Sequence, residues 1–156
     1  MSGVLNHSFE GSYDFKMDGK YRLAVPAEWR PQRGEGMQLR LLEWETERVP
    51  VLKVLTDEGF EGMLRSIDGS EGLTPGEKGQ RKGMLHTMNT AVTMNGQGKI
   101  LVPKKLADKR GLEAGGEAHL YGRGTNFDIV SPRDNAAMID AHEKLKKDLY
   151  GSVDFS

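Results

Sequence analysis

The residues with the clearest chemical potential are an aspartate, a lysine and an arginine within one short polar segment, Asp18, Lys20 and Arg22. Lysine and arginine side chains bind phosphate oxygens, and an arginine can also contact the edge of a guanine in the major groove of DNA. The Asp18 carboxylate can hold the Arg22 guanidinium in position for such a contact. Alternatively, the two side chains form an ion pair that only stabilises the local fold. The sequence leaves both roles open.

A related segment occurs again later in the chain. Residues 17–26 (MDGKYRLAVP) align without gaps with residues 94–103 (MNGQGKILVP), with identical Met, Gly, Val and Pro. Further along, residues 54–56 (VLT) correspond to residues 129–131 (IVS). Two matches in the same order indicate an internal duplication, which fixes the architecture before any single residue is considered.

We therefore expect two copies of one small module, over residues 1–72 and 73–156. In the second copy Asn95 and Lys99 take the places of the aspartate and the arginine. A lysine is a point charge without the planar fork of a guanidinium, and an asparagine cannot pair with it as a carboxylate does. The second copy should therefore bind phosphate with less geometric precision.

The elements that position these residues are predicted to be β-hairpins. Asp18-Gly19 and Asn95-Gly96 are typical of two-residue hairpin turns, and they would place the basic residues at protruding edges. Each copy is expected to run strand, tight turn, strand, short helix, strand, loop, strand and helix. Longer loops are expected in the first copy over residues 31–36 and 43–50.

Helix starts are marked by capping residues. Pro26 and Pro103 should end strands and open short helices. Thr56 and Ser131 are hydroxyl N-caps, and residues 74–77 (TPGE) form a capping box that opens a helix running to about residue 87. Two apolar stripes at helical spacing should be core or contacts between subunits. These stripes are Phe60, Met63, Leu64 and Ile67, and Met138, His142, Leu145 and Leu149.

Composition narrows the class of protein. The chain has no cysteine, which excludes disulfides and thiol catalysis. No apolar stretch approaches the roughly 20 residues of a membrane span, and the first ten residues lack the pattern of a secretory signal, so we expect a cytoplasmic protein. Lys and Arg total 22 against 23 Asp and Glu, so any attraction to nucleic acid must come from local clusters. Other basic residues that could enlarge such clusters are Lys16, Arg30, Arg33, Lys104 and Lys105.

Catalysis is not indicated. The four histidines, His7, His86, His119 and His142, lack the spacing of metal ligands. Residues 122–124 (GRG) do not match a phosphate-binding loop and are typical of a hairpin turn. We expect no enzyme, no metal and no cofactor.

The order of these motifs resembles the MraZ family. In the first half the resemblance rests on Phe9-x-Gly11-x-Tyr13, Asp18-x-Lys20-x-Arg22-Leu23 and Pro26-Ala27-x-Trp29-Arg30. In the second half it rests on residues 98–103, Leu106, Gly111-Leu112, Phe127-Asp128-Ile129, Ser131 and Pro132. It extends from Phe9 to about Leu145. The chain departs from the family pattern at Asn95 and Lys99, and Tyr21 replaces the usual glycine before Arg22, which could alter the turn.

The resemblance implies an α+β, β-rich fold, in which two tandem AbrB-like swapped-hairpin modules form a pseudo-two-fold β-barrel with peripheral helices. It also implies a cytoplasmic, nucleoid-associated repressor of the division and cell-wall gene cluster, which binds promoter repeats of double-stranded DNA as a ring of copies. The expected DNA-binding residues are Lys20, Arg22, Arg30 and Lys99, with Asp18 and Asn95 in orienting roles. The alternative is an oligomeric interaction module, related to AbrB-type antitoxins, that binds a protein partner.

Overall fold

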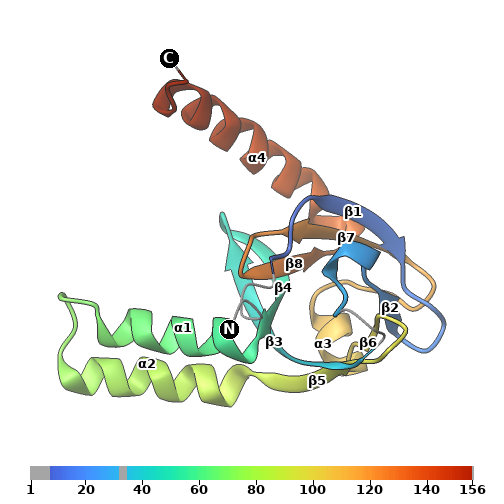
Figure 1. Cartoon of the computed structure of the whole chain (residues 1–156), viewed down its shortest axis with the longest axis horizontal. Coiled ribbons are helices and arrows are strands. Elements are labelled where there is room, and N and C mark those ends of the chain that lie inside the picture. Colours follow the sequence, from blue (N-terminus) through green and yellow to red (C-terminus); the bar gives the residue numbers. More distant parts are fainter. Residues whose placement is uncertain (1–7, 32–34, 156) are drawn as a thin grey trace.

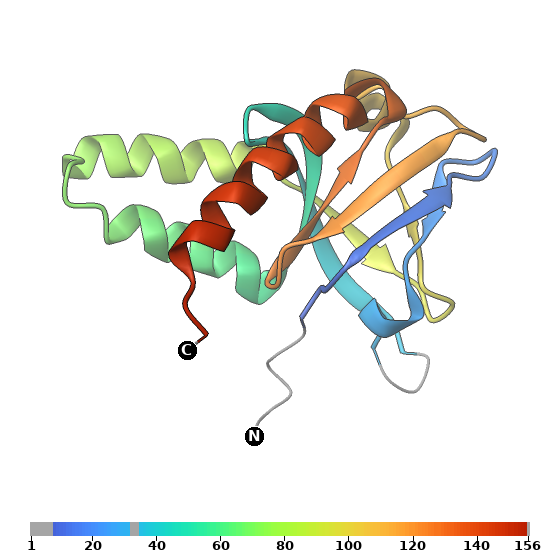
Figure 2. The ribbon, with the colours of Figure 1, turned by 90° about the horizontal axis from the view of Figure 1, so that it is seen from above.

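A computed structural model describes residues 8–31 and 35–155 of the chain. Strands form a barrel at one end, and helices leave it as two diverging arms (Figure 1). One arm is the helical hairpin of α1 (Asp57–Asp68) and α2 (Pro75–Met88), and the other is α4 (Pro132–Ser152). Seen from above, the barrel and the helical hairpin lie at opposite ends of the molecule (Figure 2).

The barrel is one eight-stranded antiparallel sheet within the described residues. The first half of the chain supplies β1 (Ser12–Lys16), β2 (Arg22–Ala24), β3 (Met37–Thr46) and β4 (Val49–Thr56). The second half supplies β5 (Thr90–Met94), β6 (Lys99–Leu101), β7 (Glu117–Gly122) and β8 (Asn126–Val130). The strand order is β1-β7-β8-β4-β3-β5-β6-β2, and a bridge between Met17 and Leu23 brings the two edge strands together.

The strand pairing follows a two-fold pattern. The pair of β1 with β7 has its counterpart in β5 with β3, and the β3–β4 hairpin has its counterpart in β7–β8. Strands β2 and β6 pair with each other across this pseudo-axis, as do β4 and β8. The expected α+β fold, with two interleaved hairpin modules in one barrel, is confirmed. The boundary between the copies near residue 72 stays a prediction.

The barrel interior is filled by alternate strand residues and by aromatic rings. Phe9, Trp29 and Phe127 are buried with ring centroids 4.7–5.5 Å apart. Trp29 belongs to the short helix η2 (Ala27–Trp29), and its indole Nε1 donates to the Glu10 carbonyl at 2.9 Å. This buried ring anchors the segment that follows β2 and so fixes where that strand ends.

The helix starts follow the predicted caps. Thr56 accepts the amide hydrogen of Gly59, Thr74 and Glu77 form the capping box, and Ser131 accepts the amide hydrogen of Asp134. The short helices η2 and α3 (Lys104–Lys109) follow prolines, as predicted, but each proline is the cap residue rather than the first helical residue. Both prolines have extended ψ angles, 145° and 131°, which are incompatible with a helical position.

The two apolar stripes have different surroundings. The α1 stripe packs against α2 around Phe60 and Leu85, so it forms a core, as predicted. In α4 only Met138 is fully buried, against the outer face of the barrel, whereas Leu145 and Leu149 are exposed. The outer half of α4 therefore extends beyond the barrel, and the described residues leave its apolar side uncovered.

The predicted loop over residues 43–50 is wrong. Strand β3 continues to Thr46 and β4 begins at Val49, so Glu47 and Arg48 alone form the turn, with φ angles of 52° and 65°. Such left-handed pairs match the twist of the flanking strands in two-residue hairpins. The predicted loop over residues 31–36 falls partly on residues 32–34, and Arg33 and His7 likewise lie outside the described residues.

Candidate nucleic-acid interface

The turn between β1 and β2 brings the Asp18 carboxylate onto Arg22. Oδ1 of Asp18 accepts the backbone amide hydrogens of Lys20 and Arg22, both at 2.8 Å. Oδ2 accepts the Nε hydrogen of the Arg22 guanidinium at 2.7 Å. These bonds, the Arg22 amide first, lower the pKa of Asp18 from 3.8 to about 2. One carboxylate thus fixes the turn with one oxygen and the arginine side chain with the other.

This turn has three residues instead of the predicted two. Gly19, Lys20 and Tyr21 separate Asp18 from Arg22, and the Asp18 amide donates to the Arg22 carbonyl at 2.9 Å. The third position is left-handed, with φ 62° at Tyr21. The Asp18 side chain bonds to amides further along the chain, which favours this longer turn over a two-residue one. Tyr21 takes the conformation that glycine would take, so the turn keeps its shape, and its ring packs against the core.

The second hairpin has the same backbone arrangement. Oδ1 of Asn95 accepts the amide hydrogens of Gln97 at 2.9 Å and Lys99 at 3.0 Å, and Gly98 occupies the left-handed position with φ 77°. Asn95 carries an NH₂ group where Asp18 has its second oxygen, and this group cannot accept a hydrogen bond from a cation. Asn95 therefore retains the turn-forming role of the aspartate but not the orienting role.

The strand register brings the cations of both copies onto one surface. Arg22 lies opposite Leu101 and Ala24 lies opposite Lys99 in the β2–β6 pair. The residues between them, Leu23 and Ile100, are fully buried, so these four side chains share the outer face. Arg22 and Lys99 are then diagonal neighbours, whose Cβ atoms lie about 7–8 Å apart in such pairs. The sequence had placed them on separate hairpins.

Two further predicted residues lie close to this face. Lys20 is exposed in the first turn. Arg30 donates from Nε and a terminal nitrogen to the Val25 carbonyl, at 3.1 and 2.9 Å. Its guanidinium also lies against Gly98, where an added Cβ would come within 2.1 Å of Nε. Arg30 of the first copy therefore supports the turn of the second.

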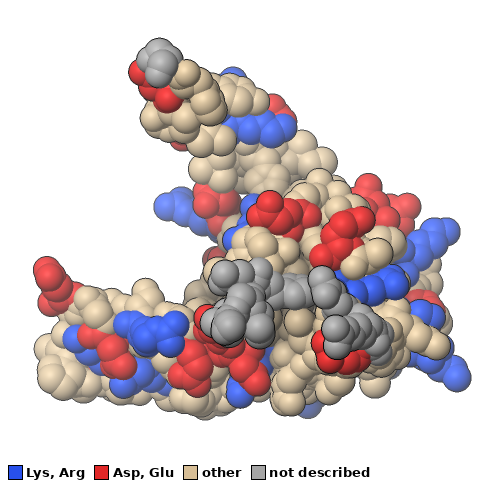
Figure 3. Space-filling model, in the orientation of Figure 1, with Lys and Arg blue, Asp and Glu red and all other residues tan. Residues whose placement is uncertain are grey.

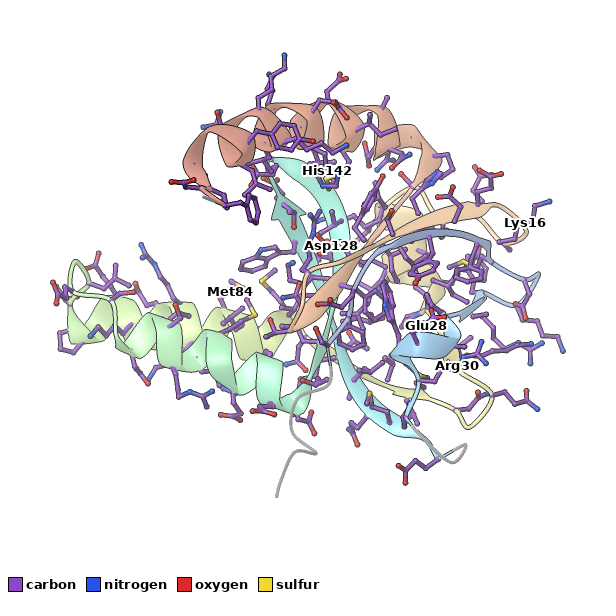
Figure 4. All side chains as sticks on the ribbon, turned by 45° about the horizontal axis from the view of Figure 1, so that its top comes forward. Lys16, Glu28, Arg30, Met84, Asp128 and His142 are labelled. Carbon is purple, nitrogen blue, oxygen red and sulfur yellow. The ribbon has the colours of Figure 1, made fainter. Side chains whose placement is uncertain are left out.

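Basic side chains gather at this end of the barrel, over the part formed by β1, β2 and β6 (Figure 3). Lys16 projects outward beside them, whereas Arg30 lies closer to the barrel wall (Figure 4). These cations form a local basic cluster on a chain whose net charge is −1 (Figure 3). Sequence reasoning gave no role to Leu101, which is exposed directly opposite Arg22. In the alignment of the two copies Leu101 corresponds to Ala24, and this correspondence was the signal in the sequence that Leu101 lies on the same face.

A buried charge network was also missed. Asp128 is fully buried, and its two oxygens accept from Lys53 Nζ at 2.8 Å and Arg123 Nε at 3.0 Å. Lys53 also donates to Asn126, and Arg123 lies 3.1 Å from His142 of α4. The network joins β4, β8 and the middle of α4. The sequence showed Arg123 only as part of a glycine-rich turn.

The described residues contain no group of three or more His, Cys, Asp or Glu side chains that could hold a metal ion. His119 pairs with Asp14, and His142 lies against Arg123. None of the described helices combines the length and the apolar character that crossing a membrane requires.

Comparison with known proteins identifies relatives that cover most of the chain, although no family model matches it. The chain is 30% identical over 130 residues to the transcriptional regulator MraZ of Roseiflexus sp., covering 80% of this chain and 82% of that protein. It is 27% identical over 147 residues to the MraZ of Hydrogenovibrio crunogenus, covering 88% and 95%. It is 26% identical over 141 residues to the MraZ of Rickettsia rickettsii, covering 87% and 93%. These relatives are named as transcriptional regulators, not as enzymes, and the extent of the likeness shows that the chain belongs to the MraZ family.

Proposed function

We propose that the protein regulates transcription by binding double-stranded promoter DNA through the outer face of the β2–β6 ribbon. The observation that carries the proposal is the placement of Arg22, held by Asp18, as a diagonal neighbour of Lys99. The major groove of B-DNA admits a two-stranded ribbon, and an arginine presented there can bind the O6 and N7 atoms of a guanine. Lys20 and Lys99 would bind phosphates on either side.

The remaining predicted residues support this face from within. Asp18 and Asn95 shape the two turns, and Arg30 braces the second turn against the first copy. The guanidinium of Arg30 keeps further N–H groups beyond the two that bind Val25, and these can reach a phosphate. Arg22 is then the residue that reads a base, and the others position it on the duplex.

A single ribbon with a few phosphate contacts binds weakly, because each contact contributes only the release of about one counterion. We therefore place the protein in a ring of copies that engages several promoter repeats at once, which raises the avidity without new contacts. Family membership supports a repressor of the division and cell-wall gene cluster, located in the cytoplasm at the nucleoid.

Two observations favour a second candidate, an oligomeric module that binds a protein partner as AbrB-type antitoxins do. The second copy lacks the carboxylate–guanidinium pair, and the outer half of α4 exposes apolar side chains. A protein partner bound there would not require the cations of the ribbon. Binding to DNA would therefore separate the two candidates.

Fluorescence anisotropy with a labelled duplex from the promoter of the protein's own gene tests the proposal. Binding should depend on the promoter repeats and should weaken steeply between about 50 and 200 mM salt. Lys144→Ala removes one positive charge from α4, away from the ribbon, and this variant should bind the duplex as tightly as the unaltered protein (Figure 1). Equal binding to a scrambled duplex, or none at low salt, would move the assignment to the protein-partner module.

A further inference from the structure

The outer face of the β2–β6 ribbon carries an exposed leucine among its cations. Leu101 is 58% exposed, whereas its neighbours in the chain, Ile100 and Val102, are fully buried. Of the large apolar side chains on the described barrel strands, it alone is exposed to this degree. Outward-facing strand positions are ordinarily polar, because they face water. Isolated surface leucines are common, so the surroundings of Leu101 decide whether this one has a role.

The residue directly opposite Leu101 is Arg22. The amide of Val102 donates to the Tyr21 carbonyl at 2.9 Å, so the next pair along the ribbon, Arg22 with Leu101, is a non-hydrogen-bonded pair. Facing side chains lie closest in such pairs, with Cβ atoms about 4.5–5.5 Å apart. A ligand that the Arg22 guanidinium binds therefore lies within reach of the Leu101 side chain.

The two copies present different side chains at equivalent places. Leu101 of the second copy corresponds to Ala24 of the first, as Lys99 corresponds to Arg22. Because the strands cross the copies, Leu101 faces Arg22 and Ala24 faces Lys99. The large apolar side chain thus stands beside the oriented guanidinium, and the small one stands beside the lysine. The second copy, which lacks a carboxylate–guanidinium pair, contributes an apolar contact at the same end of the ribbon.

DNA offers one apolar group to such a side chain. In the major groove, the C5-methyl group of thymine is the apolar feature of the base edges, and apolar side chains contact it. The other groups there are hydrogen-bond donors and acceptors, which a leucine cannot satisfy. An apolar protein surface is a poorer occupant, because it would also bury the charges of Lys20 and Arg22, which are exposed beside Leu101.

We propose that Leu101 recognises a thymine in the base pair next to the guanine bound by Arg22, by packing against the C5-methyl group. Successive bases rise by about 3.4 Å, so two side chains whose Cβ atoms are about 5 Å apart can contact adjacent base pairs. Arg22 supplies directional hydrogen bonds, and Leu101 excludes water from the methyl group. The inference rests on the proposed function and adds the residue that selects the second base.

A duplex without thymine methyl groups tests this contact while leaving the protein unaltered. In the labelled promoter duplex, every thymine is replaced by deoxyuridine, which pairs in the same way but lacks the C5-methyl group. Fluorescence anisotropy at low salt should show at least about fourfold weaker binding of this duplex, the factor that one buried methyl group contributes.

Leu101→Ala removes the side chain beyond Cβ from an exposed position, so the barrel should stay folded, which circular dichroism checks. This variant should bind the thymine duplex more weakly by a similar factor, and it should no longer distinguish the two duplexes. Lys99→Ala is the matched control, since it alters the same strand but keeps the leucine. It should weaken binding to both duplexes by one factor and keep the preference for thymine.

Two results overturn the inference. The unaltered protein binds both duplexes equally, or Leu101→Ala prefers the thymine duplex as strongly as the unaltered protein does. Both results leave the proposed function in place, because the promoter duplex is still bound. Absence of binding to either duplex at low salt is a different result, which contradicts the proposed function and this inference with it.

Discussion

The Arg22 guanidinium donates its Nε hydrogen to one oxygen of Asp18 at 2.7 Å, while the other oxygen of Asp18 accepts the Arg22 backbone amide at 2.8 Å. The two residues are therefore joined twice, once through the turn and once through the side chain. The bond that shapes the turn and the bond that holds the guanidinium are both made by the same carboxylate, and the orienting role of Asp18 toward DNA stays a prediction. Because they use different oxygens, they can be separated by substitution.

Asp18→Asn should weaken DNA binding while leaving the hairpin folded. The amide oxygen can still accept the amides of Lys20 and Arg22, as Asn95 does for its own turn, but the NH₂ group no longer holds the guanidinium. We expect an affinity loss of about tenfold, within the range of a single well-oriented base contact. Anisotropy titration measures the loss, and circular dichroism checks the fold.

Asp18→Ala is the matched comparison, since it removes both oxygens and should also destabilise the turn. Unchanged affinity in Asp18→Asn would mean that the guanidinium needs no carboxylate to bind DNA.

The Asp18 carboxyl should titrate with a pKa of about 2 in the folded protein, against 3.8 for an ordinary aspartate. A lowered pKa means that the carboxylate stabilises the folded state above pH 3.8, and this contribution is lost as the pH falls through 2. In Arg22→Ala the pKa should rise but stay below 3.8, because the backbone amides of residues 20 and 22 still donate to Oδ1. Carbon-detected NMR of the carboxyl group follows this titration. A midpoint near 3.8 in the unaltered protein would rule out the bonds of the turn.

Gly98→Ala should destabilise the protein. A left-handed conformation costs a residue with a side chain about 1–2 kcal/mol, and the new Cβ would also collide with the Arg30 guanidinium. The collision should disappear in the Arg30→Ala background, where only the conformational cost remains. Urea unfolding of the single and double variants measures both costs. An equal loss in the two backgrounds would show that Arg30 does not brace this turn.

Asp128→Asn should reduce the free energy of unfolding by about 3–5 kcal/mol, since it leaves the Lys53 and Arg123 charges without their buried counterion. Lys53→Met should cost less, because Asp128 keeps its bond to Arg123. Denaturant unfolding gives the two values directly. A larger loss for Lys53→Met would contradict the central place of Asp128 in the network.

Much of the fold could be predicted because its signals are local. The duplicated Gly-x-x-x-x-x-Val-Pro segment predicted the two-fold arrangement, and single residues such as Thr56 and Ser131 predicted the helix starts. The hairpin turn was predicted one residue too short from the Asp-Gly pair, because the Asp18 carboxylate accepts the backbone amides two and four residues further along, which favours a three-residue turn.

The assembly of the candidate site could not be predicted from the sequence. The placement of Arg22 as a diagonal neighbour of Lys99 depends on the register of β2 against β6, which joins residues from different copies. The contact of Arg30 with Gly98 likewise crosses the copies. Neither leaves a periodic pattern in the chain. In the Lys53–Asp128–Arg123 network Lys53 of β4 is 75 residues from Asp128 of β8, and the two strands meet only in the folded barrel.

The affinities of Arg22→Ala and Lys99→Ala for the promoter duplex, measured side by side by anisotropy at low salt, decide whether DNA binds the ribbon chiefly through Arg22. Both substitutions remove one positive charge from the same ribbon face, but only Arg22 is held by a carboxylate. We expect a loss of at least about tenfold for Arg22→Ala, as for a base contact, and a smaller loss for Lys99→Ala, as for a phosphate contact. Equal losses would contradict the leading role of the first hairpin, and no loss in either variant would show that DNA does not bind this ribbon.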